Sequence, residues 1–126
     1  MDHIVLPSYN CVLCQNNVEE TLFHLLMDCP FSQECWIFLG LFPNSDEEPY
    51  SILESFKNQI NVPFFMEIII LMSWDIWMAR NDLIFKGINP TIQGTIGFFK
   101  LLFTQVFHRV KESWKPQITS WLDHTL

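Results

Sequence analysis

Apolar residues recur every three or four positions along most of the chain, the spacing of helices that bury one face. The first such stretch follows Asn16 and Asn17, either of which we expect to cap it. It ends near Cys29, because the residue before Pro30 disfavours helical geometry. Pro30 suits the first turn of a second helix, which Gly40 ends. We expect that helix to bury Phe31, Cys35, Phe38 and Leu39.

The middle of the chain predicts a short helix followed by the longest one. Residues 51–54 (Ser-Ile-Leu-Glu) match a capping box and begin the short helix, after a polar acidic loop at residues 44–49. The longest helix covers residues 63–86, with proline at its start and Gly87 after its end. Because this helix is apolar on all sides around residues 68–72, it lies at the centre of the fold.

The last long helix is predicted over about residues 90–114, with Asn89 as its cap and a break at Pro116. A short amphipathic segment follows. The apolar stripe of the long helix is too wide for one neighbour, so either two helices cover it or part of it contacts another chain, such as a second copy. The stripe consists of two rows: Phe98, Leu102, Val106, Val110 and Trp114, and beside it Phe99, Phe103 and Phe107.

Together these elements predict a mainly α fold. A small CCHC zinc module precedes a bundle of two long and several short helices. We divide the chain into residues 1–42 (the zinc-binding module, with an extended lead-in over residues 1–10), 43–62 (the acidic loop and short helix) and 63–126 (the helical body), in one continuous domain. The 126 residues include 12 Phe and 5 Trp, enough apolar material for a core, so a disordered chain is excluded.

The charge of −7 is distributed unevenly along the chain. Residues 1–56 contain nine acidic residues and no Lys or Arg, whereas all seven basic residues lie at position 57 or later. Since nucleic-acid binding depends on Lys and Arg that neutralise phosphates, the acidic first part is disfavoured as a nucleic-acid surface. The basic residues near the last long helix are weak nucleic-acid candidates: Lys100, Arg109, Lys111 and Lys115.

Four residues in the acidic part have the spacing of metal ligands. Cys11, Cys14, His24 and Cys29 read C-x2-C-x9-H-x4-C, the order of a CCHC zinc knuckle with a long middle spacer. Such a set supplies the four N and S ligands that a structural Zn²⁺ takes. The alternatives are unrelated thiols with a core histidine, or disulfides in a secreted protein. Residues 1–10 lack the features of a signal peptide, so we expect an intracellular protein, cytoplasmic or nuclear.

Other residues near this set have less certain roles. Glu20 and Asp28 lie four positions either side of His24, so either could accept the second ring N–H of the histidine, although both could be ordinary surface acids. Cys35 is expected to be a small buried hydrophobe, with a fifth-ligand role as the alternative. Four ligands leave no open position on the metal, and no zinc-deaminase signature or nucleophile–base pair is present, so we do not expect an enzyme.

Val62–Ala79 is apolar enough to raise the possibility of a membrane span. Glu67 and Asp75 interrupt it, however, and each costs about 2.5–3.5 kcal/mol on insertion. The preferred interpretation is therefore a buried helix of a soluble protein, with no membrane contact.

Two blocks of the sequence resemble a known family, the zinc-binding domain near the C-terminus of reverse transcriptases from plant non-LTR (LINE-type) retrotransposons. The first block matches at Cys11, Cys14, Glu19, Glu20, His24, Leu25, Cys29, Pro30, Phe31 and Trp36. The second is the Trp-x-x-Trp-x-x-Arg-Asn segment, at Trp74, Trp77, Arg80, Asn81, Phe85 and Lys86. The resemblance implies one structural zinc in a module that accompanied a polymerase. Because the polymerase core is missing here, the chain looks like a detached C-terminal fragment.

Three functions follow from these observations. The first is a non-catalytic zinc-binding module derived from a retrotransposon reverse transcriptase, with residual nucleic-acid binding. The second is a helical protein-interaction module that self-associates through the aromatic stripe at residues 98–114. The third, and least favoured, is a small membrane-associated protein.

Overall fold

The computed structural model describes residues 9–14, 16–44 and 47–126. Its backbone over these ranges is mainly helical, which confirms the predicted class. The elements are the π-helical turn η1 (His24–Asp28), α1 (Pro30–Phe38), α2 (Pro49–Ile60), α3 (Phe65–Lys86), α4 (Ile92–Phe107), the 3-10 turn η2 (Glu112–Trp114) and α5 (Lys115–Thr125). Most of the predicted lead-in and positions 45–46 of the acidic loop lie outside the described residues.

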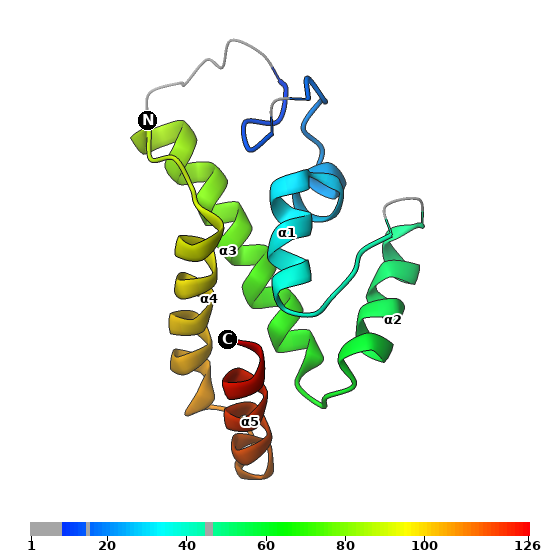
Figure 1. Cartoon of the computed structure of the whole chain (residues 1–126), viewed down its shortest axis with the longest axis vertical. Helices are drawn as coiled ribbons and strands as arrows, with labels where there is room; N and C mark the ends of the chain where they lie inside the picture. Colours follow the sequence, from blue (N-terminus) through cyan, green and yellow to red (C-terminus); the bar gives the residue numbers. More distant parts are fainter. Residues whose placement is uncertain (1–8, 15, 45–46) are drawn as a thin grey trace.

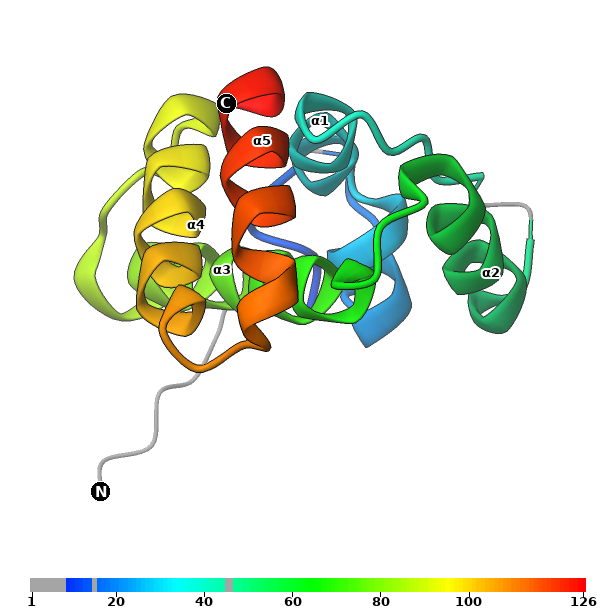
Figure 2. The same ribbon diagram turned by 90° about the horizontal axis from the view of Figure 1, so that it is seen from below.

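The longest helix, α3, runs through the centre of the molecule, as predicted. Helix α4 lies along one side of it and α1 and α2 lie on the other (Figure 1). Seen from below, α4, α5 and α1 form a row over α3, and α2 stands outside that row (Figure 2). This arrangement places the chain segment before α1 at one end of the molecule and the α4–α5 connection at the other.

The first predicted helix begins later than expected. Residues 10–14 and 16–19 belong to a tight hairpin in which the N–H of Cys11 donates to the carbonyl of Val18 (2.8 Å) and Asn10 and Glu19 form an isolated β-bridge. Asn17 has a left-handed backbone (φ 54°), so it supplies the turn and does not cap a helix. Helical geometry begins only at Leu22, after the hairpin has returned the chain.

Three shorter predictions also need correction. In α1, Cys35 and Leu39 are buried as expected, but Trp36 is fully buried and Phe38 is 47% exposed. Helix α2 begins at Pro49, whose fixed φ suits a first turn, so the predicted capping box at 51–54 lies inside the helix. Helix α3 begins at Phe65, because residues 63–64 form a turn; its predicted end before Gly87 (φ 66°) is confirmed.

The predicted helix over 90–114 is two helices. Thr91, not Asn89, caps α4, accepting the N–H of Gly94 (3.0 Å), and α4 ends at Phe107. Pro116 lies in the first turn of α5, so it begins a helix instead of breaking one. The turn between the two helices brings α5 back beside α4, which buries Ile118 and packs the half-buried ring of Trp121 against Phe103.

The predicted aromatic stripe is therefore mostly internal. Phe99 and Phe103 of the second row pack into an aromatic cluster, defined here as Phe64, Phe99, Phe103, Trp114 and Trp121, in which the centroids of contacting rings lie 5.6–6.5 Å apart. Helix α4 contacts α1, α3 and α5. Several helices therefore cover the stripe, which was the first of the two predicted alternatives. Its first row is interrupted at the end of α4, and Phe98 remains 38% exposed.

In the part of the chain that the structure describes, no single helix is both long and apolar enough to cross a membrane. Helices α2 and α3 reach the required length and hydropathy only when taken together, and they meet at a bend of 120°. Within residues 68–76 the buried side chains are those of Ile68, Ile69, Met72, Asp75 and Ile76, whereas Ile70 and Trp74 are exposed.

Candidate metal centre

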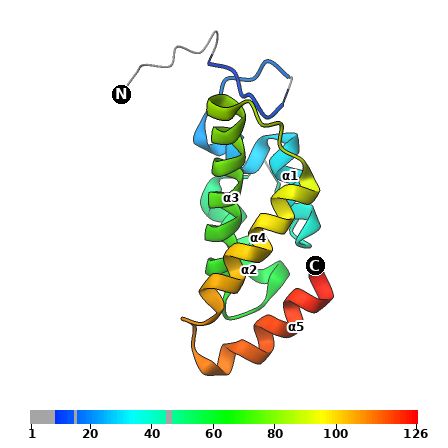
Figure 3. The same ribbon diagram turned by 90° about the vertical axis from the view of Figure 1, so that its left-hand side faces the viewer.

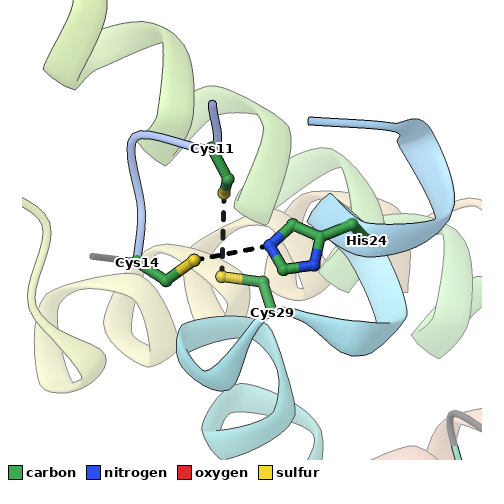
Figure 4. Close-up of side chains that lie close together, drawn as sticks. All are labelled: Cys11, Cys14, His24 and Cys29. Carbon is green, nitrogen blue, oxygen red and sulfur yellow. Dashed lines mark hydrogen bonds between the residues drawn. The ribbon is translucent and has the colours of Figure 1, made fainter. Parts of the chain in front are cut away.

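The four predicted ligands converge at one end of the molecule. Cys11 and Cys14 lie on the first half of the hairpin, His24 begins η1, and Cys29 stands between η1 and α1. Their side chains point toward one another (Figure 4). Cys11, His24 and Cys29 are buried and Cys14 is half-buried, so the cluster is largely shielded from solvent.

The distances within the cluster fit a tetrahedral metal. All four ligand atoms lie within 4.8 Å of one another. The sulfurs of Cys11 and Cys29 are 3.9 Å apart, and Cys14 Sγ lies 3.4 Å from His24 Nε2. A tetrahedral zinc, with bonds of about 2.3 Å to sulfur and about 2.0 Å to nitrogen, holds its sulfurs about 3.8 Å apart and sulfur about 3.5 Å from nitrogen. The residues therefore form a Cys₃His group that can hold a metal ion.

The cysteines of this cluster are not joined as disulfides. Cys11, Cys14, Cys29 and Cys35 are all free thiols, and the 3.9 Å between Cys11 and Cys29 far exceeds an S–S bond of about 2.05 Å. Cys35 is fully buried in the apolar core and is not a member of the metal-binding group, so the fifth-ligand alternative is not supported. Burial, together with the nearby charge of Asp75, raises the pKa of the Cys35 thiol to about 12.

The helical turn around His24 orients its ring. The hydroxyl of Thr21 accepts the backbone N–H of His24 (3.0 Å), and the N–H of Cys29 donates to the carbonyl of His24 (2.6 Å). His24 Nδ1 lies 3.0 Å from Asp28 Oδ2. If Nδ1 donates its proton to this carboxylate, Nε2 keeps its lone pair for a metal. Asp28 thus has the geometry that the sequence suggested for a carboxylate behind the histidine.

Helix α1 anchors the segment that carries His24 and Cys29. The end of η1 leaves carbonyl oxygens without helical partners, because Pro30 starts a new helix. Side chains of α1 donate to those carbonyls: the Ser32 hydroxyl to Leu25 and the Trp36 indole N–H to Leu26 (2.6 Å). A helix terminus that would otherwise be unsatisfied is in this way fixed beside the metal-binding group.

Glu20 does not play the role suggested for it. Its carboxylate Oε1 pairs with Arg80 of α3, 2.7 Å from Nη2 and 2.9 Å from Nε. The predicted role assumed one helix that includes both Glu20 and His24 and places their side chains on the same face. Glu20 instead ends the hairpin, before helical geometry begins. The Arg80 guanidinium also lies over the ring of Trp77, 4.9 Å from its centroid. Residues 60 positions apart thereby join the hairpin to α3, and both side chains are only 16% exposed.

Two of the three thiols in the cluster, Cys11 and Cys29, lie where ionisation without a counter-charge is unfavourable. Burial raises the pKa of Cys29 to about 12, and the neighbouring Cys11 adds to this effect. The pKa of Cys11 is raised by burial as well. Burial also acts to raise the pKa of Cys14, but its hydrogen bonds, first with the backbone of Asn16, lower it overall. A bound dication would supply the missing positive charge, so metal binding releases protons and weakens as the pH falls.

The four weak nucleic-acid candidates do not lie beside this cluster. Lys100, Arg109 and Lys111 are exposed on α4 and on the connection after it, whereas Lys115 is half-buried and pairs with Glu112 (2.7 Å). That connection stands at the end of the molecule opposite the hairpin (Figure 1). The positive charge and the metal-binding group therefore do not combine into one surface.

Sequence reasoning missed several residues that build the site. Thr21 lies three positions before His24, the normal spacing of a helix cap, so this signal was available locally. The Trp36 indole and the Arg80–Glu20 pair could not be recognised from spacing alone, because each depends on how α1 or α3 packs. The match of Trp36 and Arg80 to the two resembling blocks was the only indication.

Comparisons with known proteins add no further assignment, since no family model, no curated protein and no solved structure matches the chain.

Proposed function

We propose that the protein is a non-catalytic module in which Cys11, Cys14, His24 and Cys29 hold one structural Zn²⁺. The observation that carries this proposal is the convergence of the four ligand atoms within 4.8 Å, in which one sulfur–sulfur distance (Cys11–Cys29) and one sulfur–nitrogen distance (Cys14–His24) match tetrahedral zinc. Three thiolates and one imidazole favour zinc over the hard cations, which prefer oxygen ligands. Four protein ligands also fill the coordination shell, so no position remains for a substrate or an activated water.

We also propose a relation to the zinc-binding domain of plant non-LTR retrotransposon reverse transcriptases. The support comes from the two sequence blocks that resemble that family, and their contact in space gives a physical reason for their joint presence. Glu20 belongs to the first block, and Trp77 and Arg80 belong to the second. A change in either block would loosen the hairpin from α3. Because the hairpin region is acidic, we expect at most weak, salt-dependent binding of single-stranded RNA.

The experiment that tests the zinc proposal is native mass spectrometry of the full chain and two cysteine variants. We expect one zinc per chain in the unchanged protein, none in Cys11→Ala, and one in Cys35→Ala. The last variant is a matched control, because Cys35 is an equally buried thiol outside the metal-binding group. Zinc lost equally from both variants, or absent from the unchanged protein prepared with zinc, would contradict the proposal.

Self-association is a second candidate function. The exposed apolar surface that favours it lies outside the 98–114 stripe. Beside the metal centre, the side chains of Leu22 on the η1 segment and Ile70 and Trp74 on α3 are 65%, 57% and 51% exposed. They border a groove whose walls are almost entirely apolar. The same mass spectra report oligomers. We expect any dimer to dissociate in Trp74→Ser and to persist in Phe98→Ser. The opposite result would indicate that the dimer interface lies on α4.

A further inference from the structure

A cavity of about 300 Å³ lies on the far side of α3 from the apolar groove, where α3, the segment after Gly87 and the first turn of α4 meet. Figure 3 shows how α4 crosses α3 after the segment that joins them. The apolar lining of the cavity includes Met78, Ile88 and Phe98, and its polar lining includes Asp75, Asp82 and Thr95. Cavities of this size with a mostly apolar wall and a few convergent polar groups are typical of small-molecule sites.

Asp75 is the unusual member of this lining. Its side chain comes from the middle of α3 and is 2% exposed, and its Oδ2 has no hydrogen-bond partner. Burial raises the pKa of Asp75 to about 7. An orphaned carboxylate oxygen is expensive to bury, and a folded protein normally supplies it with a donor. Nothing in the described chain supplies one to Oδ2, so a donor from outside would relieve this cost.

The charge around the cavity determines what kind of donor fits. Asp75 and Asp82 lie seven positions apart, on one face of α3, and none of the lining residues is Lys, Arg or His. Asp82 is already paired with Lys86 (3.5 Å) and is more open to solvent. When it is ionised, the carboxylate of Asp75 therefore carries a charge that no basic side chain of the lining compensates. An anion is disfavoured here, and two carboxylates of which one is paired are too few for a metal ion that requires six or more oxygen ligands.

We propose that this cavity binds a small organic cation. A primary ammonium or amidinium group would donate to Asp75, and an apolar body would lie among Met78, Ile88 and Phe98. None of these residues belongs to the metal-binding group, so the inference stands independently of the zinc proposal.

The test uses benzylamine as the probe, because it joins a primary ammonium to one aromatic ring. It is titrated into the isotope-labelled, zinc-loaded full chain while the amide NMR signals of Gly94 and Thr95 are followed. We expect saturable shifts of these signals. Asp75→Asn keeps the shape of the side chain but removes its charge, and should weaken binding about ten- to hundredfold. Benzyl alcohol, which has the same ring and no charge, should bind more weakly by a similar factor.

Two further variants make the outcome decisive. Ala79→Leu fills the cavity without changing Asp75, so it should abolish the shifts even if Asp75→Asn does not fold. Asp123→Asn removes an exposed carboxylate on α5 and should leave binding unchanged. The proposal is overturned if benzylamine gives no saturable shift, if Ala79→Leu binds as well as the unchanged chain, or if Asp75→Asn and Asp123→Asn bind equally.

Discussion

Different kinds of interaction stabilise the two halves of this molecule. The metal half, residues 9–38, contains a hairpin with one isolated β-bridge, a five-residue π turn and a nine-residue helix. The aromatic half, residues 64–125, contains helices of 22, 16 and 11 residues. Helices shorter than about 12–15 residues are marginal in isolation. The metal half is therefore the one that needs additional constraints.

Directed polar contacts supply those constraints in the metal half. Four ligand side chains converge within 4.8 Å, and donors from Ser32 and Trp36 satisfy the carbonyls at the end of η1. In the aromatic half the stabilising contacts are mostly non-directional: five rings from α4, η2, α5 and the residue before α3 pack at 5.6–6.5 Å. The first half depends on a few specific atoms, and the second on buried area.

The halves nevertheless share one core. Buried residues from Cys11 to Ile118 form a single cluster, and α1 contacts both α3 and α4. The Arg80–Glu20 pair adds a charged contact between α3 and the hairpin. The halves thus differ in the kind of interaction that stabilises them. Because they share a core, unfolding of one half should lower the stability of the other but leave it folded.

Metal removal should have the largest effect and should separate the halves. A structural zinc contributes about 10–16 kcal/mol of apparent binding free energy in finger peptides, as much as the stability of a whole domain. After treatment with a chelator, we expect residues 9–38 to lose protection from amide hydrogen exchange, whereas the amides of α3–α5 retain part of theirs. Exchange followed by NMR resolves the two regions.

The control for that experiment is the same chelator saturated with zinc beforehand, which should leave all amides protected. Protection that survives chelation in residues 9–38 would show that the metal is not what holds this half. Uniform loss over both halves would show instead that the chain unfolds as one unit and that the comparison fails.

Truncation of a ring should have the next largest effect, and in the other half. Phe103 is fully buried and its ring contacts those of Phe64, Phe99 and Trp121. Phe103→Ala should lower the free energy of unfolding by about 3–5 kcal/mol, because it removes apolar area and leaves a cavity. Phe98→Ala is the matched control on the same helix, since Phe98 is 38% exposed. Urea unfolding that gives equal losses for both variants would contradict the assignment of the core row.

Removal of the carboxylate behind His24 should affect metal affinity more than folding. Asp28 Oδ2 lies 3.0 Å from His24 Nδ1, but its side chain is 41% exposed. Asp28→Ala should weaken zinc binding about tenfold, the lower end of the ~10–100-fold range for partners of ligating histidines. Glu19→Ala removes an exposed acid from the neighbouring hairpin and should leave the affinity unchanged. Competition with a chromogenic chelator measures the zinc affinity of both variants. Equal affinities would show that Asp28 is an ordinary surface acid.

Much of the architecture was predictable because its signals are local. The proline after Cys29 fixes a φ that suits the first turn of a helix, and the glycine after Lys86 permits the positive φ that ends one. The four residues of the metal-binding group were predictable for a similar reason, since a site that can hold a metal ion requires particular side chains at close spacing.

The wrong predictions concern segments whose conformation depends on tertiary packing. The segment 90–114 is periodic enough for one helix, but the turn after Phe107 allows Trp121 to reach Phe64 and Phe99. The residues after Cys14 have helical periodicity, but the chain must turn at Asn17 to bring the first two ligands toward His24. Glu20 was wrongly assigned because its partner, Arg80, lies 60 residues away. These choices depend on contacts that no short window of sequence contains.

The smallest expected effect concerns the start of α4, and it tests whether a local cap matters in the half that burial stabilises. The Thr91 hydroxyl accepts the N–H of Gly94 (3.0 Å) at an exposed position. Thr91→Ala should lower the free energy of unfolding by about 1 kcal/mol, measured by urea unfolding. Thr119→Ala is the matched control: Thr119 is equally exposed but lies inside α5, where alanine is the better helix former, so stability should stay the same or rise slightly. If both variants behave alike, burial alone holds the first turn of α4, and the capping contact contributes nothing measurable to the aromatic half.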